Sequence, residues 1–484
     1  MHDDGSATTT SDANGDTSFR TFLIVWAGQL VSLVGSSLTW FGLSVWVFLE
    51  TGSVTALSMM LLAATLPRIL LSPIAGAYVD RWNRRWVMVV SDALTGVGTL
   101  VIVVAFLTDT ISLGVLVVVG AVASAFQAFQ WPAYQAATSL LVPKERYSQA
   151  SGMVQMAEAA GQLVAPFLGG VLLAFGGVAT LLAVDVLTFA IAVVSLLVVR
   201  FPKPPASAVG EESRGSIWKE AGFGFRYVWH RHGLLALLVF FAGLNLTFGM
   251  VSPIFVAYLL SFTSEAAMGT VLSLGSSGML VGSIIASAWR VTTGRVRGIV
   301  IASLVLGLML LTIGLSQWIV VIVVSLFGGM LVVPSASALS QSIWMSKVEP
   351  DVQGRVFSVR SMISQITQPI ALLLVGPLAE FVFLPLFDEG GRLSGGLFGE
   401  GETAAYGAMF FAMGVYTIAM TLLSYSYAPL RNLERDVPDA VGLPGESDLV
   451  GGDDPPHAID TSVEPAAMLP GEDPRSNVGG RAEA

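Results

Sequence analysis

The sequence predicts an all-α polytopic membrane protein whose chain crosses the bilayer twelve times. Of its 484 residues, 54% are hydrophobic and only 12% are charged, whereas a soluble protein has roughly 25% charged residues. The apolar residues gather into twelve stretches, each near or above the roughly 20 residues that a helix needs to cross the hydrocarbon layer. The 51 glycines also suit helices that pack closely in lipid.

The chain begins with an acidic, Ser- and Thr-rich segment, residues 1–18, which we predict to be a disordered tail. The predicted spans then follow at residues 22–49, 55–79, 86–107, 111–139, 149–175, 178–199, 234–262, 267–289, 298–315, 318–345, 355–384 and 404–428. The stretch from residue 431 to residue 484 is rich in Pro, Gly and Asp, and we predict that this tail is disordered as well.

The distribution of basic residues predicts the orientation. With the N-terminus inside, sixteen Lys and Arg residues fall in cytoplasmic loops or at their helix ends, and only Arg392 falls on the opposite face. Positive charge is retained on the cytoplasmic side of membrane proteins. We therefore predict a multi-pass protein of the plasma membrane with both termini in the cytoplasm.

The longest internal hydrophilic stretch divides the spans six and six. It covers residues 201–232, contains three prolines near its start, and includes a candidate amphipathic helix over 217–230. The halves, residues 19–200 and 233–430, look weakly repeated, because the fourth and tenth spans carry internal prolines, Pro132 and Pro334. These features predict two pseudo-symmetric six-helix bundles joined by a cytoplasmic linker.

The net charge of −10 is concentrated at the ends of the chain. Four of the 34 acidic residues lie in the first 18 positions and twelve follow Arg431, so the apolar body is close to neutral and gives no indication of substrate charge. Cysteine is absent and the four histidines fall in tails or loops, which excludes a thiolate site or a histidine-based triad within the membrane. We expect no metal, no cofactor, no nucleic-acid partner and no enzymatic activity.

A short basic turn between the second and third spans carries the most specific motif. It has the pattern Gly-x-x-x-Asp-Arg-x-x-Arg-Arg, formed by Gly76, Asp80, Arg81, Arg84 and Arg85. This turn resembles the signature loop of major facilitator superfamily transporters. The resemblance implies two six-helix bundles that rock about a central site. It also implies a cytoplasmic gate, in which the aspartate faces the start of the eleventh helix, here Gly354 and Arg355.

The fifth span carries a second motif, which is similar to the fifth-helix signature of proton-coupled exporters in that superfamily. An alanine stands where the signature has one of its glycines, and the residues are Gly152, Gly161, Ala165, Pro166, Gly169 and Gly170. The same residues also suit generic helix packing. The resemblance favours export, and segments 66–85 and 129–152 look closest to the macrolide-efflux and enterobactin-exporter branch of drug:proton antiporters.

Each ionisable residue within a membrane span costs roughly 2.5–3.5 kcal/mol on insertion scales. Its presence there therefore needs a structural or functional reason. Arg68 and Glu158 both lie deep, and the spacing of Glu158 places it on the face of the fifth-span motif. We predict that Glu158 borders the cavity and exchanges protons. Asp92 and Asp185 are expected to pair with polar groups on adjacent helices, with Asp92 able to reach Arg68, and Arg360 is expected to snorkel to the interface.

Polar and aromatic residues at similar depth predict a substrate cavity suited to amphiphilic organic molecules. They are Gln29, Gln127, Gln130, Trp131, Asn245, Gln365 and Gln368. The fourth span lacks the arginine that many proton-coupled exporters of the superfamily carry, so Arg68 and Glu158 would serve in its place.

The sequence thus predicts a proton-coupled exporter of hydrophobic small molecules that works as a monomer in the lipid bilayer. No phosphate-binding loop is present in the sequence, so transport would be secondary. Two alternatives stay open. One is an importer or lysophospholipid flippase on the same fold, and the other is a non-transporting membrane sensor whose output is the acidic tail.

Overall fold

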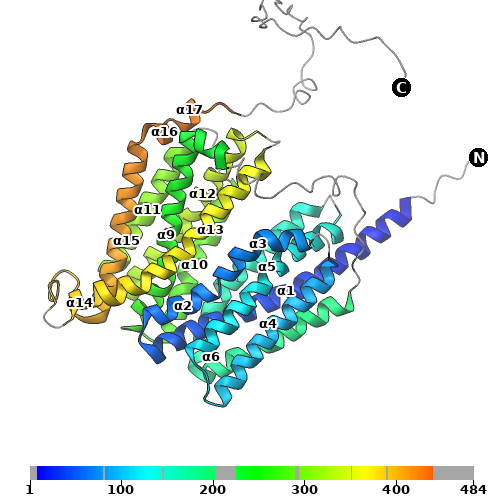
Figure 1. Ribbon diagram of the computed structural model, residues 1–484, viewed down its shortest axis with the longest axis horizontal. Coiled ribbons are helices and arrows are strands. Elements are labelled where there is room, and N and C mark those ends of the chain that lie inside the picture. The colour runs from blue at the N-terminus through cyan, green and yellow to red at the C-terminus, as the bar shows by residue number, and fades with distance from the viewer. Residues whose placement is uncertain are drawn as a thin grey trace, which may run out of the picture. The chain divides into compact units, whose positions relative to one another are not determined.

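The computed structural model describes residues 8–79, 82–143, 146–199, 201, 225–288, 294–349, 352–388 and 391–439, which are almost entirely helical (Figure 1). Within these ranges, eleven helices are long and apolar enough to cross a membrane. The predicted all-α membrane class is therefore confirmed.

The helices follow the predicted spans in order. The first half of the chain, here called the N-half, contains α1 (Thr8–Thr51), α2 (Val54–Ala63), α3 (Leu66–Val79), α4 (Arg84–Leu107), α5 (Leu113–Leu141) and α6 (Tyr147–Val198). The second half, the C-half, contains α9 (His232–Leu260), α10 (Glu265–Ala288), α11 (Arg295–Leu315), α12 (Ile319–Lys347), α13 (Gln353–Pro377), the π-helix η2 (Leu378–Phe383), α14 (Leu384–Phe387) and α15 (Gly401–Ser426). Two short helices follow, α16 (Ala428–Arg431) and α17 (Leu433–Asp436).

Both tails are shorter than the composition predicts. Helix α1 begins at Thr8, inside the segment predicted to be disordered, because extending an existing helix avoids the unfavourable step of nucleation. At the other end, Leu430 and Leu433 are buried, and the Lys347 ammonium donates to the Glu434 carbonyl oxygen at 2.8 Å. Apolar burial thus holds the chain to Asp439 against the C-half. Of the candidate linker helix, only residues 225–230 are described, and they are helical.

The fifth and sixth predicted spans are joined in one element, α6, which is interrupted at Gly177. This residue has φ 63° and ψ −172°, a conformation that glycine adopts readily because it has no Cβ. In the first arm, Gly161 lies against Leu33 of α1 and Gly169 lies against Phe41. Along this contact, the residue numbers of α1 and of the first arm of α6 rise in the same direction, so the first arm runs parallel to α1.

The second arm of α6 runs antiparallel to α1. Glycines spaced seven residues apart on α1 each lie against a side chain of this arm, in the pairs Gly28–Ser195, Gly35–Thr188 and Gly42–Leu181. A Cβ on any of the three glycines would lie 2.0–2.3 Å from its partner, so the helices approach as closely as small residues permit. Element α6 therefore supplies two of the twelve predicted spans.

The second predicted span is broken in its middle. Helix α2 ends at Ala63 and α3 begins at Leu66, just before Pro67, which has no backbone N–H to continue the ladder. The backbone N–H of Arg68, in the first turn of α3, has no partner within its own helix. It donates instead to the Ser124 hydroxyl of α5 at 3.1 Å, so the break fixes the position of Arg68 against α5.

The two halves contact each other mainly through two helix pairs, α6 with α10 and α2 with α13, and smaller contacts join α1 and α2 to α9. In the first pair, a Cβ on Gly269 would lie 2.2 Å from the Pro166 carbonyl oxygen, and the Ser273 hydroxyl donates to the Leu163 carbonyl oxygen at 2.7 Å. In the second pair, a Cβ on Gly376 would lie 2.5 Å from the Cα of Thr55. Backbone-to-backbone packing therefore joins the halves at both contacts.

Candidate functional site

The main polar cavity lies in the N-half, has a volume of about 340 Å³, and brings together seven of the predicted site residues. These residues come from helices α1, α3, α4, α5 and α6 and are Gln29, Arg68, Asp92, Gln127, Gln130, Trp131 and Glu158. Glu158, which the sequence analysis expects at the border of the central cavity, lines this cavity of the N-half.

A hydrogen-bonded chain crosses one wall of this cavity. The side-chain amide of Gln130 donates to Gln29 Oε1 at 2.6 Å, and the amide of Gln29 donates to Asp92 Oδ2 at 2.7 Å. Asp92 is only 5% exposed, so water has little access to its carboxylate. The Gln29 amide supplies the hydrogen-bond donor instead. The expected ion pair between Asp92 and Arg68 is not formed in the described chain, because Asp92 instead faces α1 and accepts from Gln29.

Sequence reasoning missed Tyr134, which also lines the cavity. Its hydroxyl is buried and has no hydrogen-bond partner among the described residues. The signal was available, because Gln127, Gln130, Trp131 and Tyr134 follow the i, i+3, i+4, i+7 spacing that places residues on one face of a helix. A buried hydroxyl without a partner needs an acceptor or donor from a bound molecule or water.

Asp185 and Arg360 both form hydrogen bonds with side chains of neighbouring helices, while the snorkelling expected of Arg360 stays a prediction. The carboxylate of Asp185 accepts from the Thr99 hydroxyl of α4 at 3.1 Å and from the Ser36 hydroxyl of α1 at 3.4 Å. It therefore pairs with polar groups on adjacent helices, as expected. The Arg360 guanidinium donates to Gln341 Oε1 at 2.6 Å, so its charge is held by a side chain of the neighbouring helix α12.

The three predicted cavity residues of the C-half do not join the polar cavity. Asn245 donates to the Ser364 hydroxyl at 2.6 Å and lines a separate cavity of about 280 Å³. Gln365 donates to the Ser361 hydroxyl of its own helix, and Gln365 and Gln368 are exposed. The sequence analysis selected these residues by their depth along a span, and depth carries no information about which face of the helix they occupy.

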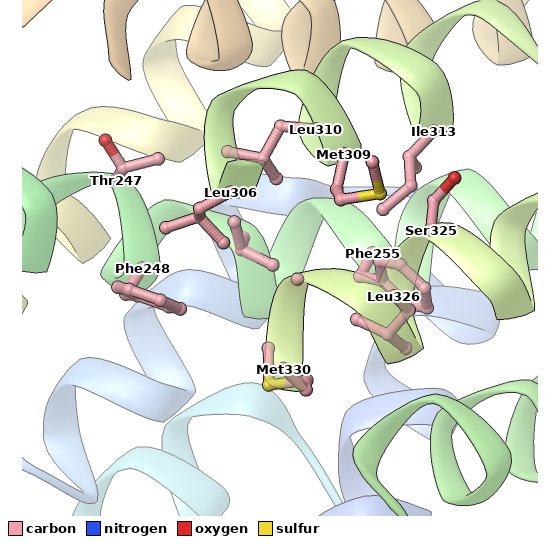
Figure 2. Close-up of a pocket in the computed structure, with 12 residues that line it drawn as sticks. Thr247, Phe248, Phe255, Leu306, Met309, Leu310, Ile313, Ser325, Leu326 and Met330 are labelled. Carbon is pink, nitrogen blue, oxygen red and sulfur yellow. The ribbon is translucent and has the colours of Figure 1, made fainter. Parts of the chain in front are cut away.

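A third cavity, deeper in the C-half, is almost entirely apolar. Figure 2 shows Phe248 and Phe255 of α9 beside Leu306 and Met309 of α11 and Met330 of α12. Its volume is about 20 Å³, and none of the residues that line it is ionisable. The ionisable groups within the described cavities are therefore those of the N-half.

The gate motif is described only in part. Asp80 and Arg81 lie outside the described residues, as do the surroundings of Gly354 and the side chain of Arg355, so the contact expected between Asp80 and the start of α13 lies outside them too. Gly76 lies within α3, and Arg84 begins α4. Arg85 donates to the Leu196 and Leu197 carbonyl oxygens at 2.8 and 2.6 Å, and it thereby caps the C-terminal end of α6.

The fifth-span motif packs α6 against two neighbours. Gly161 and Gly169 face α1, as described above, and Ala165 is buried beside them. A Cβ on Gly170 would lie 2.9 Å from the Glu265 carbonyl oxygen of α10, so Gly170 and Pro166 form the contact with the C-half. Gly152 has open space around it. The motif therefore acts in packing, and part of it lies where the halves meet.

The groups that line the polar cavity are suited to binding a small molecule and, through the two carboxyl groups, to gaining or losing charge. Two carboxyl groups, one guanidinium, three amides and an indole face a space large enough for a small organic molecule. Within the described residues, no group of three or more His, Cys, Asp or Glu side chains is placed to hold a metal ion.

Comparisons with known proteins agree with this architecture. A family model described as Major Facilitator Superfamily matches residues 25–372. The chain is similar to Macrolide efflux protein A of Streptococcus pyogenes, at 27% identity over 369 residues that cover 74% of this chain and 89% of that protein. It is also similar to Multidrug efflux pump Tap of Mycolicibacterium fortuitum, at 25% identity over 373 residues, with 74% and 89% of the two chains covered.

A solved structure supports the fold independently. The crystal structure of a bacterial homologue of the human lysosomal transporter Spinster, inward-facing and unoccupied, aligns with a TM-score of 0.64. The sequence identity is 13%, and the alignment covers 85% of this chain and 96% of that chain. At such low identity, the likeness shows the fold alone.

Proposed function

This chain belongs to the Major Facilitator Superfamily, and we propose that it is a secondary transporter that exports amphiphilic organic molecules in exchange for protons. The observation that carries the proposal is the N-half cavity, which combines the carboxyl groups of Asp92 and Glu158 with Arg68 and the indole of Trp131. Two relatives, each covered over 89% of its length, bear the names of efflux proteins.

The walls of the cavity suit a cargo that is apolar over most of its surface and polar at a few points. Trp131 offers an aromatic face, while the amides of Gln127 and Gln130 and the hydroxyl of Tyr134 offer hydrogen bonds. The volume of about 340 Å³ lies at the lower end of the roughly 300–1,000 Å³ of small-molecule sites. A larger cargo would extend out of this cavity towards the C-half, where further apolar surface is available.

In this proposal, Glu158 carries the coupling proton. Carboxyl groups within membrane spans are rare, and they mark ion and proton pathways. Glu158 is half-buried and faces the cavity, so a proton or a cationic cargo can reach it. Asp92 is buried behind Gln29 and acts as a fixed negative charge or a second proton site. Arg68 supplies the positive charge that favours release of the proton.

The arrangement in the membrane belongs to the same proposal. Both termini would lie in the cytoplasm and the protein would work as a monomer in the plasma membrane, driven by the proton gradient without a cofactor. The basic turn that holds Gly76, Asp80 and Arg81 would close the cytoplasmic side of the cavity against the start of α13. These contacts would break when the cavity opens to the cytoplasm.

Accumulation of a macrolide and of a cationic dye in cells that express the protein tests the proposal. Cells with the wild-type protein should accumulate less of the compound than cells without it, and a protonophore should abolish the difference. Glu158→Gln should accumulate as much as empty cells, while the expressed protein stays folded. Asp109→Asn is the matched control, because Asp109 is exposed in the turn after α4 and its φ of 52° suits Asn as well as Asp.

Export that persists in Glu158→Gln with full sensitivity to the protonophore would reject Glu158 as the carrier. Export that is insensitive to the protonophore would reject proton coupling, and unchanged accumulation of all compounds in wild-type cells would reject export of these classes.

A further inference from the structure

A second buried carboxylate, that of Asp185, is not used in the mechanism proposed above. Asp185 lies on the second arm of α6, seven residues beyond Val178, or about 10 Å along the helix axis at 1.5 Å per residue. Its side chain is 2% exposed, and none of the ion pairs within the described chain includes it. A carboxylate at this depth requires a compensating charge or a proton.

Hydroxyl groups surround this carboxylate on three helices. The hydroxyls of Thr99 and Ser36 lie 3.1 and 3.4 Å from its two oxygens. The Thr188 hydroxyl donates to the backbone carbonyl of Asp185 at 2.8 Å. The Thr39 hydroxyl is buried as well, at 5% exposure; it lies close enough to the Asp185 carboxyl to interact with it, but it forms no hydrogen bond of ordinary geometry among the described residues. A buried hydroxyl without such a bond indicates an occupant that would supply one.

A small cavity provides the space for such an occupant. Ser36, Thr39, Thr99 and Asp185 line a cavity of about 20 Å³, which is room for about one particle of the size of a water molecule. The rest of its wall is mainly apolar, with side chains such as Trp40. The residues that line this small space therefore carry six side-chain oxygens, two from the Asp185 carboxylate and four from the hydroxyls of Ser36, Thr39, Thr95 and Thr99, and no basic residue lines it.

We infer that this cavity between α1, α4 and the second arm of α6 binds one sodium ion, with Asp185 as its charged ligand. Carboxylate and hydroxyl oxygens are ligands for hard cations, and a single negative charge balances a monovalent ion. Calcium instead takes six to eight oxygens, commonly from several carboxylates. Sodium has nearly the radius of calcium, whose ligands lie at about 2.3–2.6 Å, so neighbouring oxygens of an octahedral shell lie about 3.3–3.7 Å apart. The Thr99 and Ser36 hydroxyls donate hydrogen bonds to the carboxylate over 3.1 and 3.4 Å, so these oxygens lie close to such separations before an ion is bound.

The ion site has a route to the main cavity. Ser36, Thr95 and Phe189 line both spaces, so a cation enters the small cavity from the larger one. Ion binding is an equilibrium property of the folded protein. The inference therefore stands apart from the proposed export, and it can be measured on protein that transports nothing.

Thermal unfolding of the purified full-length protein in detergent tests the inference, with sodium chloride, potassium chloride or choline chloride at equal ionic strength and neutral pH. A ligand that binds only the folded state raises the melting temperature in a saturable manner. Sodium should raise it for the wild type, and choline should not. Asp185→Asn should reduce the sodium-induced rise at least fivefold, and Thr39→Val should increase the half-saturating sodium concentration about 10-fold.

Two controls keep the test specific. Asp109→Asn changes an exposed carboxylate, and Thr312→Val removes an exposed hydroxyl that bonds only within its own helix; both should keep the full sodium response. If Asp185→Asn fails to fold, Thr39→Val decides, because an unchanged half-saturating concentration in that variant overturns the inference. Equal stabilisation by sodium and choline also overturns it.

Discussion

The Glu380 carboxylate of η2 accepts a hydrogen bond from the Ser53 hydroxyl at 2.6 Å, although the two residues belong to different halves of the transporter. The same Glu380 oxygen accepts from the backbone N–H of Thr55 at 3.0 Å. It thus caps the start of α2, where unpaired N–H groups and the helix dipole favour a negative charge. Glu380 lies in a π-helical turn, a feature that is often found at functional sites.

We therefore expect Glu380→Gln to loosen the contact between α2 and α13. The amide keeps one acceptor but loses the charge that binds the helix start, so this end of the transporter should open more often. The chain has no cysteine, which allows a single Ser58→Cys probe in this contact, where Ser58 is 1% exposed. Labelling of that cysteine by a membrane-impermeant maleimide should become several-fold faster in Glu380→Gln.

Glu400→Gln is the control for this measurement, because Glu400 is an exposed residue just before α15. Equal labelling rates in Glu380→Gln and in the parent protein would show that the hydrogen bonds to Ser53 and Thr55 do not hold the contact closed.

The sequence was sufficient for the order of the helices, because each span satisfies the simple rule of length and apolarity, although α6 contains two of the twelve predicted spans. It was insufficient for the breaks within them. The interruption at Ala64 and Thr65 in front of Pro67 depends on a partner, Ser124, that no local pattern reveals. Glu380 was overlooked for a related reason: it lies one turn inside the predicted end of its span and resembles an interfacial residue.

For the candidate site, spacing could predict which residues of one helix line the same cavity, but it could not assign residues of the two halves to one cavity. The residues of α5 fall on one face by spacing alone, and Glu158 falls on the face of its motif. Asn245 and Gln368 meet the criterion of depth along their predicted spans, but depth does not specify the angle around the helix. Hydroxyl partners such as Thr39 and Thr99 carry no signal in a sequence, because threonine is common in helix interfaces for other reasons.

The contact between α6 and α10 gives a second prediction. A Cβ on Gly269 would lie 2.2 Å from the Pro166 carbonyl oxygen, and backbone cannot move aside as a flexible side chain does. Gly269→Ala should destabilise the protein by about 1–3 kcal/mol, as overpacking does, and should lower export. Thermal unfolding and dye accumulation measure the two effects.

Gly152→Ala is the matched control for that substitution, since Gly152 belongs to the fifth-span motif and has no atom within 4 Å of an added Cβ. It should be neutral or slightly stabilising, because Ala favours a helix over Gly by roughly 0.5–1 kcal/mol. Similar losses in both variants would mean that the motif tolerates no Cβ anywhere and that the Pro166 contact is not the cause.

A third prediction concerns the amide that bridges Asp92 and Gln130. Gln29→Met keeps the length of the side chain but removes the donor to Asp92 and the acceptor for Gln130. Leaving buried polar groups without partners costs about 1–3 kcal/mol, so the melting temperature should fall and export should be impaired. Gln365→Met, at an exposed position bonded only to its own helix, should change neither. A Gln29→Met protein with the stability and export of the wild type would contradict a role for this chain of hydrogen bonds.

The last prediction concerns pH and the segment that precedes α9. The Tyr227 hydroxyl donates to Glu349, and this hydrogen bond, with Arg231 at 3.2 Å from the carboxylate, holds the pKa of Glu349 below its ordinary value. Burial, together with the bond to Glu349, raises the pKa of Tyr227 to about 12, so the phenol stays a donor at neutral pH. A lowered carboxyl pKa stabilises the folded state above the unfolded-state pKa, and this stabilisation is lost as the pH falls through the folded-state value.

Residues 225–231 should therefore be protected from amide hydrogen exchange at neutral pH and lose protection as the medium becomes more acidic than about pH 4, the pKa of a free glutamate. Tyr227→Phe removes the hydrogen bond that is the main cause of the lowered pKa of Glu349. In this variant, the protection of residues 225–231 should already be reduced at neutral pH and should change less on acidification. Tyr427→Phe, at a half-exposed position, serves as the control. If Tyr227→Phe shows the pH profile of the wild type, the hydrogen bond between Tyr227 and Glu349 does not anchor this segment, and the ion pair with Arg231 must hold it alone.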